Sequence, residues 1–194
     1  MTFQEYKLEL HLAYNQHPND NREEELYSII ATILRETYSK NIYEKKLYSI
    51  RDVHLSPHPR NNLLYGKAGY PDLVIFSQEL QDDRDNNEIA NIWGAVEIKA
   101  IGLINYNKDK KHILGEIDTF TKVLYTNGLF WIFYDNHQKK ASSLEDYIWK
   151  IDLYNNPIKG QDNDSKLDLV NNLNFSKWKA LLSKLRCIKW EPEN

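Results

Sequence analysis

Two apolar segments carry charged residues, and this combination constrains the fold more than any other feature of the chain. The first segment, "GYPDLVIF" (69–76), has Asp72 near its head, and the second, "WGAVEIKA" (93–100), contains Glu97 and Lys99. Both segments have the short apolar runs that are typical of strands in a sheet core. Burying an unpaired charge is costly, so charged residues at such positions are usually paired or bound to a metal.

The rest of the chain predicts helices and strands in an order that suggests a layered domain. A turn cluster at 16–21 ends a short N-terminal element and offers Asn21 as the N-cap of the next helix. We predict helices over 22–40, 112–125 and 175–190, strands over 45–55, 72–76, 92–101, 129–135 and 146–154, and a basic loop over 105–111. This order predicts an α/β or α+β fold with a central mixed β-sheet flanked by helices.

Composition places the chain among ordinary soluble proteins. Its 194 residues suit one domain with a substantial core, and 41% of them are hydrophobic and 27% charged. The net charge of −3 gives no overall basic character, although a local basic patch is enough to bind nucleic acid. A single cysteine, Cys187, fits a reducing compartment. No apolar stretch has the length of a membrane span or of a secretory signal, so we expect a cytoplasmic protein without a membrane partner.

The charged residues of the two segments have the chemistry of a metal site. Residues two apart share one face of a strand, so Glu97 and Lys99 lie together, and Asp72 joins them if the two strands are neighbours. Two carboxylates suit Mg²⁺, with Mn²⁺ as a substitute, and a lysine beside the ion would orient an attacking water. Each motif alone is commonly a surface charge pair or a turn. Together, in order and with apolar flanks, they are much more informative.

Pro71-Asp72 followed by Glu97-Ile98-Lys99 resembles the active-site signature of the PD-(D/E)XK nuclease superfamily. The resemblance implies a restriction-endonuclease-like core. It also implies that Asp72, Glu97 and the backbone carbonyl of Ile98 bind the metal, while Lys99 assists the nucleophilic water.

Many members of that superfamily carry a further glutamate on the helix before the first strand. The segment "REEE" offers three glutamates, and helical geometry places Glu23 nearest to the apolar stripe that centres on Leu26. We therefore take Glu23 as a third metal-binding and catalytic carboxylate. The alternative, that all three glutamates only favour the helix N-terminus through its dipole, is equally consistent with the sequence.

The resemblance continues over residues 22–135 and is closest to the nuclease domain of type I restriction motor subunits. There a Gln-x-x-x-Tyr pattern on a helix precedes Thr-Asn-Gly, whereas this chain has Glu116 and Phe120 before Thr126-Asn127-Gly128. We predict nucleic-acid contacts for residues of this helix and of the loops before it: Arg60, Lys67, Lys108, Lys110, Lys111 and Glu116. Residues 136–194 are expected to pack on the core as an extension of the same domain.

The sequence thus predicts a Mg²⁺-dependent endonuclease of a restriction or mobile-element defence type, acting on DNA rather than RNA. Two alternatives stay open: an RNA endonuclease with the same metal chemistry, and a non-catalytic subunit that keeps the fold to bind nucleic acid or a protein. A homodimer or a larger restriction-type assembly would suit cleavage of both strands. The six histidines show no metal-binding spacing, so none of them, His112 included, is given a role.

Overall fold

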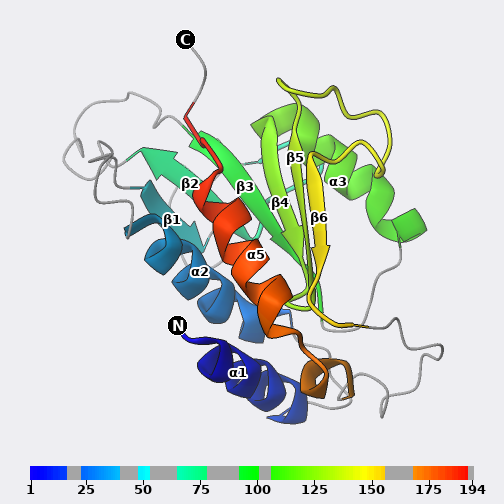
Figure 1. Cartoon of the computed structure of the whole chain (residues 1–194). Helices are drawn as coiled ribbons and strands as arrows, with labels where there is room; N and C mark the ends of the chain where they lie inside the picture. The colour runs from blue at the N-terminus through cyan, green and yellow to red at the C-terminus, as the bar shows by residue number, and fades with distance from the viewer. Residues whose placement is uncertain are drawn as a thin grey trace.

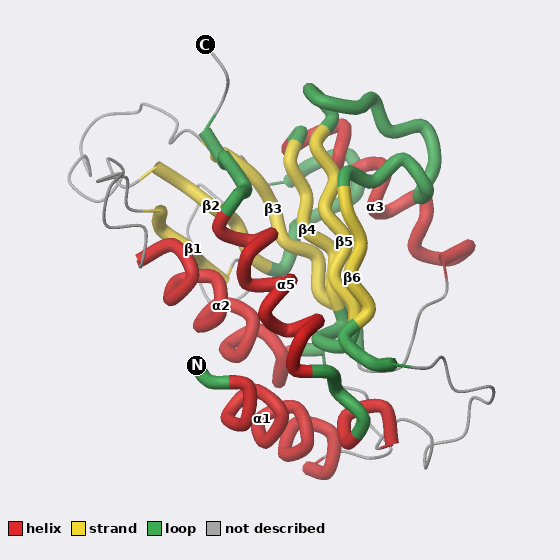
Figure 2. The backbone as a smooth tube through the Cα atoms, in the orientation of Figure 1, coloured by secondary structure: helices red, strands yellow, loops and turns green. Residues whose placement is uncertain are grey.

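A computed structural model describes residues 1–16, 23–39, 48–52, 65–77, 92–100, 106–155 and 168–191. Six strands form one sheet in the order β1-β2-β3-β4-β5-β6 (Figures 1 and 2). β3 and β4 are parallel and all other neighbours are antiparallel, so the predicted mixed sheet flanked by helices is confirmed. The strands are β1 (Tyr48–Asp52), β2 (Leu73–Ser77), β3 (Ile92–Ile98), β4 (Lys122–Thr126), β5 (Phe130–Asp135) and β6 (Trp149–Asp152).

Helices cover both faces of this sheet. They are α1 (Phe3–Gln16), α2 (Glu24–Ser39), α3 (Tyr106–Phe120) and α5 (Phe175–Arg186). α1, α2 and α5 lie on the near face in Figure 1, and α3 lies on the far face. The alternation of side chains along β3 divides the core accordingly, because Val96 and Ile98 pack with the near helices while Ala95 packs with Ile113 and Ile117 of α3.

The most regular helix, α2, follows the predicted apolar stripe. Leu26, Ile30 and Ile33 are almost fully buried against the sheet, while Glu24 and Ser28 on the opposite side are exposed. The predicted N-cap Asn21 lies outside the described residues, as does the acidic segment at 78–91. The start of α2 lies beside the end of β3, because Glu23 is 3.8 Å from the Lys99 ammonium.

The predicted helix over 112–125 is wrong at both ends. α3 begins at Tyr106, so the basic segment expected as a loop forms its first turns. The helix ends at Phe120, and Thr121 then adopts a left-handed backbone with φ 65°, which redirects the chain into the buried strand β4. Leu124 continues the helical spacing of Ile117 and Phe120, so hydrophobic periodicity alone did not reveal the break.

The C-terminal part of the chain adds one strand to the sheet and one helix to the near-face layer. β6 extends the sheet beside β5, and α5 packs Trp178, Leu181 and Leu185 into the near-face core. The predicted last helix ends at Arg186 rather than 190, and fully buried Trp190 packs edge-on against Tyr38 and Phe133. Among the described helices, none has the length and apolar character that crossing a membrane requires.

Candidate functional site

Asp72 is fixed at the point where β2 begins. β2 and β3 pair with Leu73 opposite Val96, so Asp72 lies next to the end of β3, as expected if the two segments are neighbours. Its side chain is only 6% exposed. The Tyr27 hydroxyl of α2 donates to Oδ1, and the Ile98 backbone N–H donates to Oδ2 at 2.6 Å. The Asp72 carboxylate therefore connects the start of β2 to α2 and to the end of β3.

Glu97 and Lys99 lie together at the end of β3. Glu97 is 2% exposed and points toward α3, since its neighbours Val96 and Ile98 point into the opposite core. The Lys99 ammonium donates to Glu97 Oε1 and lies 3.8 Å from Glu23 Oε2, just before α2 begins. The Lys99 backbone N–H is held by Thr126 O at 2.8 Å. The structure thus brings Asp72, Glu97, Lys99 and Glu23 to one end of the sheet.

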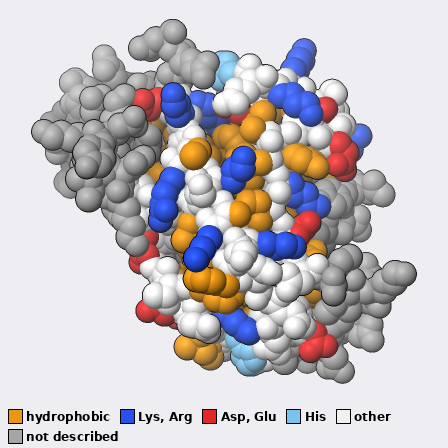
Figure 3. Space-filling view, in the orientation of Figure 1, with side chains coloured by type: hydrophobic (Ala, Val, Ile, Leu, Met, Phe, Trp, Pro, Cys, Tyr) orange, Lys and Arg blue, Asp and Glu red, His pale blue; other side chains and the backbone are white. Residues whose placement is uncertain are grey.

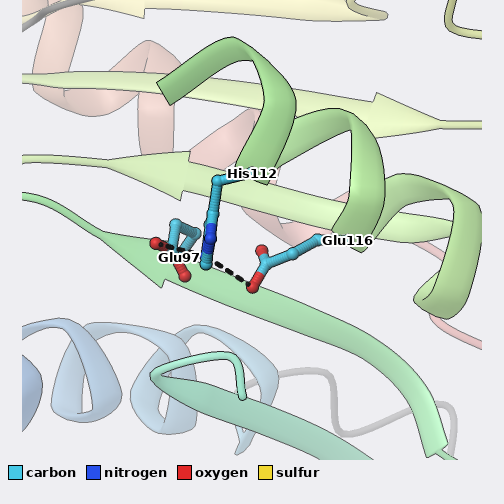
Figure 4. A group of neighbouring side chains, drawn as sticks. All are labelled: Glu97, His112 and Glu116. Atoms are coloured by element: carbon cyan, nitrogen blue, oxygen red, sulfur yellow. Dashed lines mark ion pairs between the residues drawn. The ribbon is translucent and has the colours of Figure 1, made fainter. Parts of the chain in front are cut away.

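Two residues of α3, His112 and Glu116, complete this group. The sequence analysis did not predict that either of them lies beside Glu97. His112 and Glu116 are one helical turn apart and both face Glu97 (Figure 4). His112 Nε2 lies 3.0 Å from Glu97 Oε1 and 3.3 Å from Glu116 Oε1. Glu116 is fully buried, although it was predicted to contact nucleic acid. The His-x-x-x-Glu spacing on a predicted helix is the signal that could have revealed the pair.

The close packing of these charges shifts their protonation equilibria. Burial, and next the negative charge of Glu97, raises the pKa of Asp72 to about 6. Burial also raises the pKa of Glu116 to about 8. Burial acts on Glu97 in the same direction, but the contact with His112 and the charge of Lys99 outweigh it and lower the pKa of Glu97. The site therefore contains one firmly ionised carboxylate among groups of shifted pKa.

The two cations of the site are stabilised in their charged forms. Contacts with Glu116 and Glu97 raise the pKa of His112 to about 10. Burial alone would lower the pKa of Lys99, but the charge of Glu97 and the hydrogen bond to it raise that pKa above its usual range. Both cations therefore neutralise Glu97 at physiological pH.

The donor atoms fit a divalent cation. Glu97, His112 and Glu116 each present one ligand atom, and these atoms all lie within 4.8 Å of one another. None of the described residues donates a well-aligned hydrogen bond to Glu97 Oε2 or to either oxygen of Glu116. Buried acceptors without donors are rare in folded proteins and call for an explanation, such as an ion. Asp72 and Glu23 add carboxylates nearby, whereas a role for the Ile98 carbonyl as a ligand stays a prediction.

The predicted nucleic-acid contacts divide into several groups. Lys110 and Lys111 are exposed on α3 next to His112, and Lys108 lies in the first turn of the same helix, with its side chain outside the described residues. Lys67 is exposed and pairs with Asp118 of α3 at 3.2 Å. Arg60 lies outside the described residues. Basic residues therefore lie beside the carboxylates on the α3 side.

The opposite face of the sheet is also basic. Lysine and arginine side chains are spread over the face that α1, α2 and α5 present (Figure 3), and α5 contributes exposed Lys179, Lys184 and Arg186 without an acidic residue. Because this helix lies on the other side of the sheet from α3, its charges are not part of the carboxylate site.

Comparison of the chain with models of protein families, with curated proteins and with solved structures gave no match.

Proposed function

We propose that the chain is a divalent-cation-dependent nuclease of the PD-(D/E)XK superfamily, with a restriction-endonuclease-like core, that hydrolyses phosphodiester bonds and acts on DNA rather than RNA. The observation that carries the proposal is the convergence of Asp72, Glu97 and Lys99 at one end of the sheet, although 27 positions separate the first from the last. This arrangement has the residue types, order and proximity that the signature requires.

The acidic residues would hold the cation, for which Mg²⁺ is the expected ion and Mn²⁺ a substitute. Asp72 is held in one orientation by Tyr27 and Ile98, and Glu97 is held by Lys99 and His112, so both carboxylates are oriented without the ion. When bound, such a cation supplies a more acidic water and neutralises charge that builds up on phosphate. Glu23, which is partly exposed at 3.8 Å from Lys99, is the third candidate ligand.

Lys99 would position the attacking water. Its side chain is 18% exposed, so the ammonium reaches both the buried carboxylates and the surface. The water would accept a hydrogen bond from this ammonium and donate one to a carboxylate, which would align its oxygen with phosphorus. One P–O bond then forms to the water oxygen, and the opposite P–O bond breaks. The water loses a proton to solvent, and the leaving sugar oxygen takes up a proton from solvent.

The exposed side of the site offers a route for a polyanion. His112 and Glu23 are 35% and 38% exposed by side chain, whereas Glu97 beneath them is buried. Lys110 and Lys111, which are exposed on α3 just before His112 in sequence, would contact the phosphate backbone. The same resemblance suggests a restriction or mobile-element defence setting, in which a homodimer would cut both strands of a duplex.

The proposal is tested with purified full-length chain and radiolabelled duplex DNA, single-stranded DNA and RNA. Each substrate is incubated with Mg²⁺, Mn²⁺ or excess EDTA, and the matched variant Lys99→Met keeps the length of the side chain but removes its charge. We expect cleavage of DNA with a divalent cation only, and its loss in Lys99→Met. Equal cleavage by Lys99→Met, or cleavage in EDTA, would refute the assignment. Binding of nucleic acid without cleavage under every condition would favour a non-catalytic subunit.

A further inference from the structure

In the proposed mechanism His112 only helps to hold Glu97, and Glu116 has no role, although both lie close to Glu97. Neither belongs to the Asp-Glu-Lys pattern, and both come from α3 rather than from the strands. His112 Nε2 contacts one carboxylate oxygen of Glu97 and one of Glu116, at 3.0 and 3.3 Å. We therefore consider what Glu97, His112 and Glu116 could bind together.

The three side chains have the geometry of a preformed site. Their ligand atoms lie mutually within 4.8 Å, which is close enough for one ion to bind all three. β3 fixes Glu97 through its pairing with β2 and β4, and α3 fixes the other two on one helical face. Glu116 lies beside Gly115, which packs so closely against Ala68 that an added Cβ would be 3.0 Å from the Ala68 Cβ. The helix is therefore held firmly against the chain segment that precedes Asp72.

The carboxylates at this place have unused acceptor capacity. Glu116 is fully buried, yet neither of its oxygens accepts a well-aligned hydrogen bond from the described residues, and the same holds for Glu97 Oε2. His112 pairs with Glu116 Oε1, but Oε2 of each glutamate has no hydrogen-bond partner among the described residues, and a buried carboxylate oxygen without a partner is costly. By contrast, both oxygens of Asp72 accept hydrogen bonds, from Tyr27 and Ile98. The unsatisfied acceptors thus lie on the α3 side of Glu97.

We propose that Glu97, His112 and Glu116 form a cation site of their own, which takes a first-row transition-metal ion such as Mn²⁺ or Zn²⁺ in preference to Mg²⁺. An imidazole nitrogen suits transition metals, whereas Mg²⁺ strongly prefers oxygen ligands and its own water shell. Because contacts with Glu97 and Glu116 favour a proton on His112, the ion would displace that proton to solvent when it binds Nε2. Glu97 is shared with the Asp72 side, so the end of the sheet offers two adjacent cation positions. The inference concerns metal binding and does not depend on cleavage.

The experiment measures Mn²⁺ binding to the EDTA-stripped full-length chain by calorimetry and by pulsed electron paramagnetic resonance, which detects nitrogen coupled to the ion. We expect a modulation from an imidazole nitrogen, and its change when histidine is labelled with ¹⁵N. We also expect Mn²⁺ to bind more tightly than Mg²⁺, because the site includes an imidazole nitrogen.

Variants assign the signal to these residues. His112→Gln should abolish the nitrogen modulation, and Glu116→Gln should weaken Mn²⁺ binding at least about tenfold, which is the usual order of loss at a metal site. Asp118→Asn is the matched control, because it changes an exposed carboxylate two positions further along the same helix. Asp72→Asn should leave the nitrogen modulation in place. Circular dichroism confirms that each variant is folded, and the ¹⁵N experiment needs no variant.

Two results would overturn the inference: bound Mn²⁺ without a coupled imidazole nitrogen, or unchanged Mn²⁺ affinity in both His112→Gln and Glu116→Gln. Either would mean that the three residues form only a structural ion pair. If DNA is still cleaved in that case, the proposed nuclease function stands. If the nitrogen-coupled ion is present and no nucleic acid is cleaved, the cation site stands and the nuclease function fails.

Discussion

The two ends of the sheet each hold a lysine beside an acidic residue, but the charges at the two ends have different partners. Because β3 and β4 are parallel, Lys99 beyond β3 and Lys122 at the start of β4 lie at opposite ends. We refer to the end with Lys122 and Asp135 as the closed end, and to the end with Asp72, Glu97 and Lys99 as the open end. The comparison separates charges that serve the fold from charges that are available to a ligand.

At the closed end, the charged groups have protein partners. The Lys122 ammonium donates to the backbone carbonyls of Lys189 and Glu191, both at 2.6 Å. Asp135 accepts hydrogen bonds from the backbone N–H groups of His137 and Gln138 and from the Gln138 side chain. These contacts hold the segment after α5 and the turn after β5, so the charges at this end stabilise the fold.

At the open end, carboxylates that are buried to a similar degree have oxygens without a well-aligned hydrogen-bond donor among the described residues. Glu97 and Glu116 are at most 2% exposed, but three of their four oxygens receive no well-aligned hydrogen bond from the described residues. Burial and charge are common to both ends, so neither property marks a functional site. Carboxylate oxygens without a well-aligned hydrogen-bond donor among the described residues distinguish the open end, and a cation would satisfy them.

Two single variants, Lys99→Met and Lys122→Met, give the strongest test of the difference between the two ends. Lys99→Met should lower the cleavage rate at least about a hundredfold, since it removes a positioned donor from the reacting water. Lys122→Met should leave the rate per folded molecule within a few fold, because its ammonium contacts only backbone carbonyls at the other end of the sheet. The rates are measured on labelled DNA with the folded fraction determined in parallel. A large loss of activity in both variants would remove the distinction between the ends.

Divalent cations should stabilise the open end and do nothing for the closed one. A cation at a concentration of a hundred times its dissociation constant adds about 2.7 kcal/mol to the free energy of unfolding. The unfolding midpoint of the wild-type chain is compared in EDTA and in Mn²⁺ by denaturant titration. In Glu116→Gln this increment should shrink, because one of the proposed ligands has been replaced. A Mn²⁺ increment that is unchanged in Glu116→Gln would contradict the account.

Lys122→Met should cost stability in a way that no cation restores. Two carbonyls in strong contact with the ammonium would lose their donor, for which we expect a loss of about 2 kcal/mol in the free energy of unfolding. The loss should be equal in EDTA and in Mn²⁺, as measured by chemical denaturation. Recovery of stability in Mn²⁺ would show that the two ends are coupled.

The smallest expected effect concerns the orientation of Asp72. Tyr27→Phe removes the hydroxyl that donates to Asp72 but keeps the ring, which is 8% exposed in the core. The free energy of unfolding should fall by about 1 kcal/mol, as for a typical hydrogen bond. Cleavage should slow by less than in Lys99→Met, since Ile98 still holds the other carboxylate oxygen. Unaltered kinetics together with unaltered stability would show that the hydroxyl does not orient Asp72.

The part of the site that could be predicted from the sequence depends on strands. Asp72, Glu97 and Lys99 lie within or beside short apolar runs, and the period of two in a strand places Glu97 and Lys99 on the same side. Glu23 followed from the apolar stripe of α2, because the helical period places it near the buried face. These inferences use only local periodicity, which one sequence contains. Their roles in binding a metal and in catalysis stay predictions.

The parts that could not be predicted depend on contacts between distant segments. The partners of Lys122 lie 67 and 69 positions along the chain, so no local pattern indicates them. His112 and Glu116 gain their meaning from Glu97, which belongs to another element. The end of α3 depends on Thr121, a β-branched residue with positive φ, for which the sequence offers none of the usual glycine or asparagine signals.

The most direct measurement is anomalous diffraction from a crystal of the full-length chain soaked in Mn²⁺. Our account predicts an anomalous peak within about 2.5 Å of a Glu97 oxygen, with carboxylate or imidazole neighbours from the open end and no peak beside Asp135. A map without a peak at Glu97, in which its carboxylate remains paired with Lys99 and His112, would contradict the central claim that this end of the sheet binds a divalent cation.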